Sequence, residues 1–158
     1  MTLRKLLLPA LALLLLSSAG MRRAAQGQTN TTGLSGSWIG VVTLPPGLGN
    51  GGPIMLSFNS NGTVMVVTAN GGADSVGVGT WVSTGNGQYA LTTIQFAYDN
   101  NANPSGNKKA RISISVSGSQ MSGNAELVVT DATGAVQADI TGITFTASPI
   151  AVETIGSM

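Results

Sequence analysis

A strict alternation of side-chain types is the feature that most constrains the fold of this 158-residue chain. From Ala110 to Ser117, small or apolar side chains alternate with Arg or Ser, and from Met121 to Val129 apolar or small residues alternate with Ser, Asn and Glu. A period of two places alternate side chains on opposite faces of a β-strand. These two stretches therefore predict strands with one buried and one solvated face, joined at Gly118-Ser119 by a tight hairpin.

Further stretches show the same pattern, separated by short segments rich in turn residues. No convincing helix is predicted after the first 27 residues. The eight predicted strands are residues 37–44, 54–59, 63–69, 76–84, 88–99, 109–117, 121–130 and 135–147.

The connections predict that consecutive strands are neighbours. Asn61-Gly62, Asn86-Gly87 and residues 131–134 are hairpin-type turns, because Gly and Asn accept positive φ. The alternation changes phase at Thr141-Gly142 and also at Thr92-Thr93, which indicates two bulges or bends. Eight strands with two bends favour an all-β, antiparallel, up-and-down β-barrel, because closure removes the unpaired edges. The alternative is a two-sheet β-sandwich.

Residues 1–27 have the pattern of a removable signal peptide. Arg4 and Lys5 precede an apolar run over residues 6–16, which is too short to span a bilayer as a mature helix, and small residues follow. Cleavage is predicted after Ala19 or after Gly27, and the second site also removes the Arg22-Arg23 pair. We therefore expect a leader helix that is removed and an exported protein, periplasmic or extracellular, with no stable membrane span.

The predicted mature chain has three parts. Residues 28–35 are expected to form a flexible N-terminal segment, residues 36–149 the barrel, and residues 150–158 a C-terminal tail that follows Pro149.

The composition excludes several classes of function. Beyond Gly27 three cations face six carboxylates, a net charge of −3, which argues against a nucleic-acid partner. The chain has no His and no Cys. Ser-His-Asp and Cys-His catalysis, His-based metal sites and disulfides are therefore unavailable to it, and a packed core must supply the stability.

Two polar segments are candidates for ion binding. Residues 99–107 are rich in Asp and Asn, but Pro104 and Ala110 stand where a calcium-binding EF-hand loop requires Gly and Glu, so we expect a solvated loop at the barrel mouth and no metal. Lys108, Lys109 and Arg111 form the one basic cluster of the mature chain. They are interpreted either as a patch for an acidic ligand or lipid headgroup, or as charges at a strand end that oppose aggregation.

Four short motifs carry a resemblance to a known group of barrels. Gly36-Ser37-Trp38 resembles the Gly-x-Trp at the start of the first strand in lipocalins and other calycins, including the avidin group. Gly79-Thr80-Trp81, residues 89–92 (Tyr-Ala-Leu-Thr) and Phe145-Thr146-Ala147 are similar, in this order, to segments of small exported bacterial lipocalin-like proteins. The resemblance implies a closed eight-stranded barrel and no assigned biochemical activity. The late Arg that packs over the Trp in calycins is not evident, and Pro149 stands near its place.

An eight-stranded barrel is wide enough either to be filled by its own side chains or to hold one small ligand. Small residues such as Gly77, Gly79, Gly123 and Ala125 would leave space inside, or would admit large rings from neighbouring strands. The predicted ligand contacts are five of the seven aromatic residues: Trp38, Trp81, Tyr89, Phe96 and Tyr98.

Three functions are consistent with these features. The first is an exported, noncatalytic barrel without cofactor that binds a small apolar or amphipathic molecule. The second is a structural or interaction module of the cell envelope or extracellular matrix. The third is a cofactor-free barrel enzyme, which would need two carboxylates, or a carboxylate and Tyr89 or Tyr98, facing each other in a cavity. An outer-membrane barrel is disfavoured because the outward faces read as Ser, Thr and Asn. The oligomeric state does not follow from the sequence.

Overall fold

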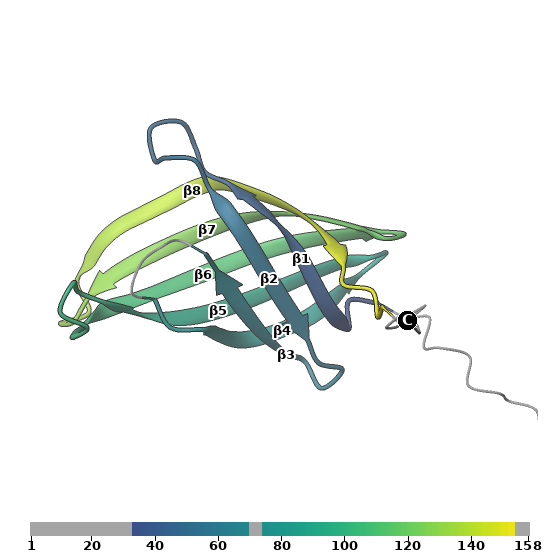
Figure 1. Ribbon diagram of the computed structural model, residues 1–158, viewed down its shortest axis with the longest axis horizontal. Helices are drawn as coiled ribbons and strands as arrows, with labels where there is room; N and C mark the ends of the chain where they lie inside the picture. The colour runs from purple at the N-terminus through teal and green to yellow at the C-terminus, as the bar shows by residue number, and fades with distance from the viewer. Residues whose placement is uncertain (1–32, 70–73, 154–158) are drawn as a thin grey trace, which may run out of the picture. The chain divides into compact units, whose positions relative to one another are not determined.

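Eight antiparallel strands form a closed barrel in the computed structural model, which describes residues 33–69 and 74–153 (Figure 1). The predicted signal peptide and residues 28–32 lie outside the described residues, as do residues 154–158 of the predicted tail. The strands are β1 (Gly36–Thr43), β2 (Gly52–Phe58), β3 (Thr63–Thr68), β4 (Gly77–Gly85), β5 (Gln88–Tyr98), β6 (Pro104–Ser117), β7 (Gln120–Asp131) and β8 (Val136–Pro149).

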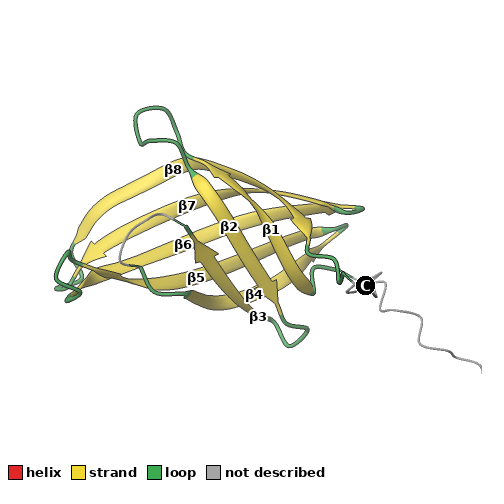
Figure 2. Cartoon of the chain, in the orientation of Figure 1, coloured by secondary structure: helices red, strands yellow, loops and turns green. Residues whose placement is uncertain are grey.

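Each strand pairs with the next one in sequence, and β8 pairs with β1 to close the barrel. The closing ladder runs from Trp38 opposite Pro149 to Thr43 opposite Thr144. The predicted eight-stranded up-and-down barrel is thus confirmed, and the β-sandwich alternative is excluded. Figure 2 shows that the described chain consists of strands and short connections, with no helix.

The largest difference from the predicted boundaries is at β6. This strand begins at Pro104, five residues earlier than expected, because Gly106 and Asn107 pair with both β5 and β7. The predicted long mouth loop is therefore a tight turn, in which the amide of Asp99 donates to the carbonyl of Asn103 at 2.9 Å.

One of the two predicted phase changes is a bulge. In β8, Ile143 pairs with Ala125 and Ile140 pairs with Leu127, so Thr141 and Gly142 together oppose a single residue of β7. Gly142 has a φ of +76°, which favours glycine at this position.

The phase change predicted at Thr92-Thr93 was wrong. The inward parity of β5 continues without a break from Tyr89 through Leu91 to Thr93, which is only 3% exposed, while Ile94 and Phe96 lie on the outer face. The apolar residues at the end of β5 therefore face outward, while the inward positions there are the polar residues Thr93 and Gln95.

The barrel is plugged at the end where β1, β3, β5 and β7 begin. Leu34 is completely buried and lies within the same core as Trp38, whose Nε1 donates to the carbonyl of Leu34 at 3.1 Å. Sequence reasoning placed Leu34 in a flexible segment, whereas the structure makes residues 33–35 part of the closed end. The C-terminal end of β8 lies at this same plugged end, where the amide of Ile150 donates to the carbonyl of Ser37 at 2.8 Å. Both ends of the described chain therefore lie here.

The outer surface of the barrel has two different faces. On β6 to β8 the outward residues are mostly polar, and Arg111 pairs there with Glu126 in register. On β1 to β5, and at the residue just before β4, nine outward apolar side chains are 39–58% exposed, and we call them the outer apolar face. Its members are Ile39, Val41, Met55, Met65, Val67, Val76, Val78, Ile94 and Phe96.

No helix long and apolar enough to cross a membrane occurs among the described residues.

Gly79 is predicted to be essential for closure of the barrel. A Cβ at this position would lie 1.9 Å from the carbonyl oxygen of Thr92 and 2.8 Å from Cα of Thr93, both backbone atoms of the paired strand β5. We expect Gly79→Ala to destabilise the protein by about 1–3 kcal/mol, because either strand can yield only by disturbing the ladder. Urea denaturation measures the effect, with the neighbouring outward Thr80→Ala as the matched control. Equal midpoints for the two variants would contradict the assignment.

Candidate functional site

The barrel encloses a cavity of about 350 Å³ at the end opposite the plug. Residues of the β1–β2 connection, including Leu44 and Asn50, lie at its mouth. Its volume is near the lower end of the range for ligand pockets, ~300–1,000 Å³. The barrel is therefore neither completely filled nor wide open.

Most of the cavity wall is apolar. The wall side chains come from the inward positions of six strands: Val42, Ile54, Val66, Ile112, Leu127, Ile143 and Phe145. Ala110 and Ala125 also face the cavity, and their small side chains leave much of its space.

The small residues that were expected to create space have separate roles. Gly123 accommodates the ring of Phe145, since a Cβ there would be 2.3 Å from its Cε1. Gly79 accommodates the backbone of β5, and Gly77 lies against the side chain of Gln95. Of the four small residues named from the sequence, only Ala125 lines the cavity.

Four polar side chains lie on one side of the cavity: Thr68, Thr93, Gln95 and Lys108. Thr93 is buried, and Thr68 Oγ1 is buried with no hydrogen-bond partner among the described residues. A buried hydroxyl without a partner costs free energy, so this oxygen favours occupancy of the cavity by water or by a ligand that hydrogen bonds.

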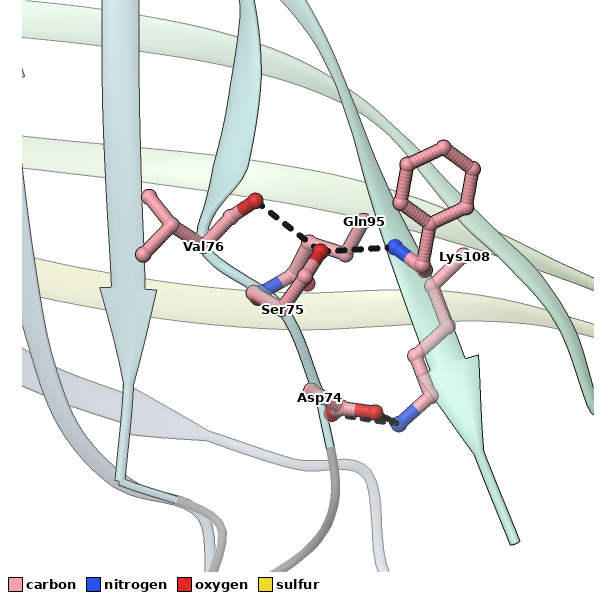
Figure 3. A network of polar contacts seen from close by, with 6 residues as sticks. Asp74, Ser75, Val76, Gln95 and Lys108 are labelled. Atoms are coloured by element: carbon pink, nitrogen blue, oxygen red, sulfur yellow. Dashed lines mark hydrogen bonds and ion pairs between the residues drawn. The ribbon is translucent and has the colours of Figure 1, made fainter. Parts of the chain in front are cut away.

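Lys108 is paired with Asp74, which precedes β4 (Figure 3). Its Nζ lies 2.8 Å from Oδ1 and 2.6 Å from Oδ2 of the carboxylate. The Lys108 side chain is 27% exposed and that of Asp74 is 11% exposed. Water therefore reaches the pair only in part, and the two charges neutralise each other at the cavity.

The three basic residues of β6 do not form one patch. Lys108 faces inward, whereas Lys109 and Arg111 have the opposite parity and lie on the outer surface. The signal for this split was present in the strand period, because consecutive residues of a strand face opposite sides.

Three of the five predicted ligand contacts lie in the plug. Trp38 and Tyr89 are buried in the core, and Trp81 packs edge-on against Tyr89, with ring centroids 5.7 Å apart. Phe58 makes a similar edge contact with Trp81 at 6.1 Å. Trp81 Nε1 donates to the carbonyls of Asn59 and Thr63, each at 3.1 Å, so the ring is anchored to the β2–β3 turn.

The other two predicted contacts lie away from the cavity wall. Phe96 is on the outer apolar face and is 57% exposed. Tyr98, at the end of β5, has the same outward parity and is half-buried. None of the five predicted aromatic residues lines the cavity. The residues that do line it were missed because they are Thr, Gln, Lys and aliphatic residues, types that carry no specific binding signal.

The carboxylates beyond Gly27 lie in different environments. Asp74 is at the cavity beside Lys108, Glu126 pairs with Arg111 on the outer surface, and Asp139 lies on the exposed side of β8. Among the described residues, no group of three or more acidic side chains is arranged to hold a metal ion.

Asp99 and Asp131 each organise a turn at the mouth end. The amides of Asn103 and Asn101 donate to Asp99 Oδ1 at 2.9 and 2.8 Å, and these bonds lower the pKa of the Asp99 carboxyl below its ordinary value. The Thr133 hydroxyl donates to Asp131 Oδ1 at 2.6 Å and, with the amides of Ala135 and Thr133, lowers the pKa of Asp131. Both carboxylates are thus used within their own turns.

No protein-family model, no curated protein and no solved structure matches this chain. The fold and the chemistry of the cavity therefore carry the functional argument alone.

Asp131 is predicted to make the stability of the folded protein decrease at acidic pH. Its pKa is lower in the folded protein than in the unfolded chain, so its contribution is complete above the unfolded pKa, near pH 4, and disappears as the pH falls through the folded value. We expect Asp131→Asn to lower the thermal midpoint at pH 7 and to have a smaller effect below pH 3. Asp139→Asn, on the exposed side of β8, is the matched control. A difference between wild type and Asp131→Asn that grows on acidification would refute the prediction.

Proposed function

We propose that this protein is a noncatalytic barrel that binds one small apolar or amphipathic molecule in the cavity at its open end. The observation that carries the proposal is the 350 Å³ cavity, which combines an apolar wall with a few polar groups on one side. This combination is typical of ligand pockets, in which apolar contacts supply most of the affinity and a few polar atoms orient the ligand.

The architecture supports a lipocalin-like relationship. Closure of eight strands in sequential order is the arrangement that the Gly-x-Trp resemblance implies, and Trp38 plugs one end of this barrel. We further propose that the protein acts after export, in the periplasm or outside the cell, because residues 1–27 have the signal-peptide pattern.

The positions of the acidic residues support a noncatalytic role. An acid–base mechanism needs a second titratable group facing the first across the cavity. Asp74 is instead matched with Lys108 at hydrogen-bond distance, while Tyr89 lies in the plug and Tyr98 near the outer surface.

The experiment that tests the proposal is native mass spectrometry of the protein purified from its native host, before and after extraction with organic solvent. We expect an extractable mass of a few hundred daltons, in keeping with the cavity volume. A bare mass, together with no binding of apolar probes, would contradict the proposal. Intrinsic Trp fluorescence is a poor reporter here, because neither Trp38 nor Trp81 lines the cavity.

Filling the cavity is predicted to abolish binding without harming the fold. Ala110 faces the cavity between Thr93 and Leu127, so Ala110→Leu places three additional carbons inside it. We expect at least about a tenfold loss of affinity for the fluorescent apolar probe N-phenyl-1-naphthylamine, measured by fluorescence titration.

Ala90→Leu is the matched control, because Ala90 has outward parity on β5 and pairs with the exposed residues Val82 and Ser113. Equal affinities of the two variants for the probe would place the binding site elsewhere.

The outer apolar face supports a second candidate function, that of an interaction module. Its members are continuous across strands, since Ile39 pairs with Met55, Met55 with Val67, and Val78 with both Met65 and Ile94. Nine side chains, each about half exposed, present roughly 700 Å² of apolar surface, close to the ~800 Å² that each partner contributes to a standard interface. None of the nine is charged, so a second copy of this chain can pack against the face without charge repulsion.

Val78 lies at the centre of the outer apolar face, and its substitution tests this second function. We expect sedimentation velocity to detect a dimer of the wild type at micromolar concentrations and Val78→Lys to weaken dimerisation by at least about tenfold, because it buries an unpaired charge. Val82→Lys, on the outer surface of the same strand but outside the face, should leave the dimer intact. A wild type that stays monomeric at about 100 μM would rule out a second copy as the partner.

A further inference from the structure

We infer that the cavity selects ligands with a neutral, hydrogen-bonding head group, such as a hydroxyl or a carbonyl, and discriminates against anionic head groups. This inference rests on the proposed binding function and concerns its specificity. It follows from the state of Lys108, the cation that lines the cavity.

The charge of Lys108 is already used within the protein. Both oxygens of the Asp74 carboxylate lie within 2.8 Å of Nζ, so two of the three N–H donors of the ammonium have an acceptor. The pair presents no net charge to the cavity. A lysine alone at this position would attract a carboxylate, but a neutralised lysine offers one donor to an uncharged acceptor.

Binding of an anionic ligand to Lys108 would cost free energy, because it would affect the Asp74 carboxylate. If the ligand displaced the carboxylate, Asp74 would remain as an unpaired charge whose side chain is 11% exposed. If the ligand bound beside Asp74, two negative charges would lie within a few ångströms of each other in a poorly hydrated site. Both arrangements disfavour an anion.

The backbone that carries Asp74 is fixed beside β5, close to Lys108 (Figure 3). Asp74 forms an antiparallel bridge with Ala97, and the amide of the next residue, Ser75, donates to the carbonyl of Phe96 at 2.9 Å. Gln95 Nε2 donates to the carbonyl of Ser75 at 3.2 Å. The segment that carries Asp74 is thus paired to β5, and movement of its backbone away from Lys108 would require the loss of these bonds.

The remaining polar atoms of the cavity suit a neutral head group. Thr68 Oγ1 is buried and has no hydrogen-bond partner within residues 33–69 and 74–153, and the buried Thr93 also lines the cavity. A ligand hydroxyl can both accept from Lys108 and exchange a hydrogen bond with a threonine, whereas a carboxylate can only accept. An alcohol therefore satisfies more of the cavity than an acid does.

Isothermal titration with two probes of equal chain length, 1-decanol and decanoate, tests the inference at pH 7.5. For the wild type we expect 1-decanol to bind at least about tenfold more tightly than decanoate. Because an alcohol also partitions better into apolar surroundings, the variants decide the cause. Asp74→Asn frees Lys108 and should shift the ratio of the two affinities toward decanoate by at least about tenfold.

The combined variant Asp74→Asn/Lys108→Met should lose that shift, since no cation then faces the cavity. Arg111→Met/Glu126→Gln removes the ion pair on the outer surface and should leave the ratio unchanged. Circular dichroism checks the fold of each variant. If Asp74→Asn does not fold, a wild-type ratio that does not favour 1-decanol still overturns the inference.

The outcomes separate the two claims. Decanoate binding to the wild type as tightly as 1-decanol, or an unchanged ratio in a folded Asp74→Asn variant, would overturn the inference and leave the proposed binding function standing. If neither probe binds to any variant, both the binding function and its specificity fail.

Discussion

The pairing of β8 with β1 is the constraint on which the rest of the structure depends. This ladder gives the first and last strands a partner on both sides, so every strand hydrogen bonds to two neighbours. Closure also separates an inside from an outside at each residue, because side chains alternate along a strand. The chain contains no Cys, and the closed ladder with its core takes the place of disulfide bridges.

The two ends of the barrel interior differ in packing. At the closed end Leu34, Trp38 and their aromatic neighbours form a packed core that supplies stability. At the open end the residues become smaller or polar, and a cavity remains beside Lys108. If the cavity binds a ligand as proposed, binding and the packing of the closed end use different side chains.

Strand period and turn chemistry were sufficient to predict the fold, whereas the site depends on long-range pairing. The alternation around β6 and β7 and the Asn-Gly turns are local signals, and they led to the correct strand number and order. The aromatic residues predicted to contact a ligand do not line the cavity, because large rings fill the plug and Phe96 lies on the outer surface. Only the register that brings Asp74 to Lys108 across 34 residues defines the polar side of the cavity, and no short motif encodes such a pairing.

The position of the described chain ends has a practical consequence for any study of binding. Leu34 is anchored under Trp38, and Ile150 is hydrogen bonded to Ser37, so the chain enters and leaves the barrel at its plugged end. A protein coupled to a sensor surface near either of these points would hold its open end toward the solution. Attachment there would leave access to the cavity unobstructed, and the same geometry would serve a barrel that is tethered while it captures small molecules.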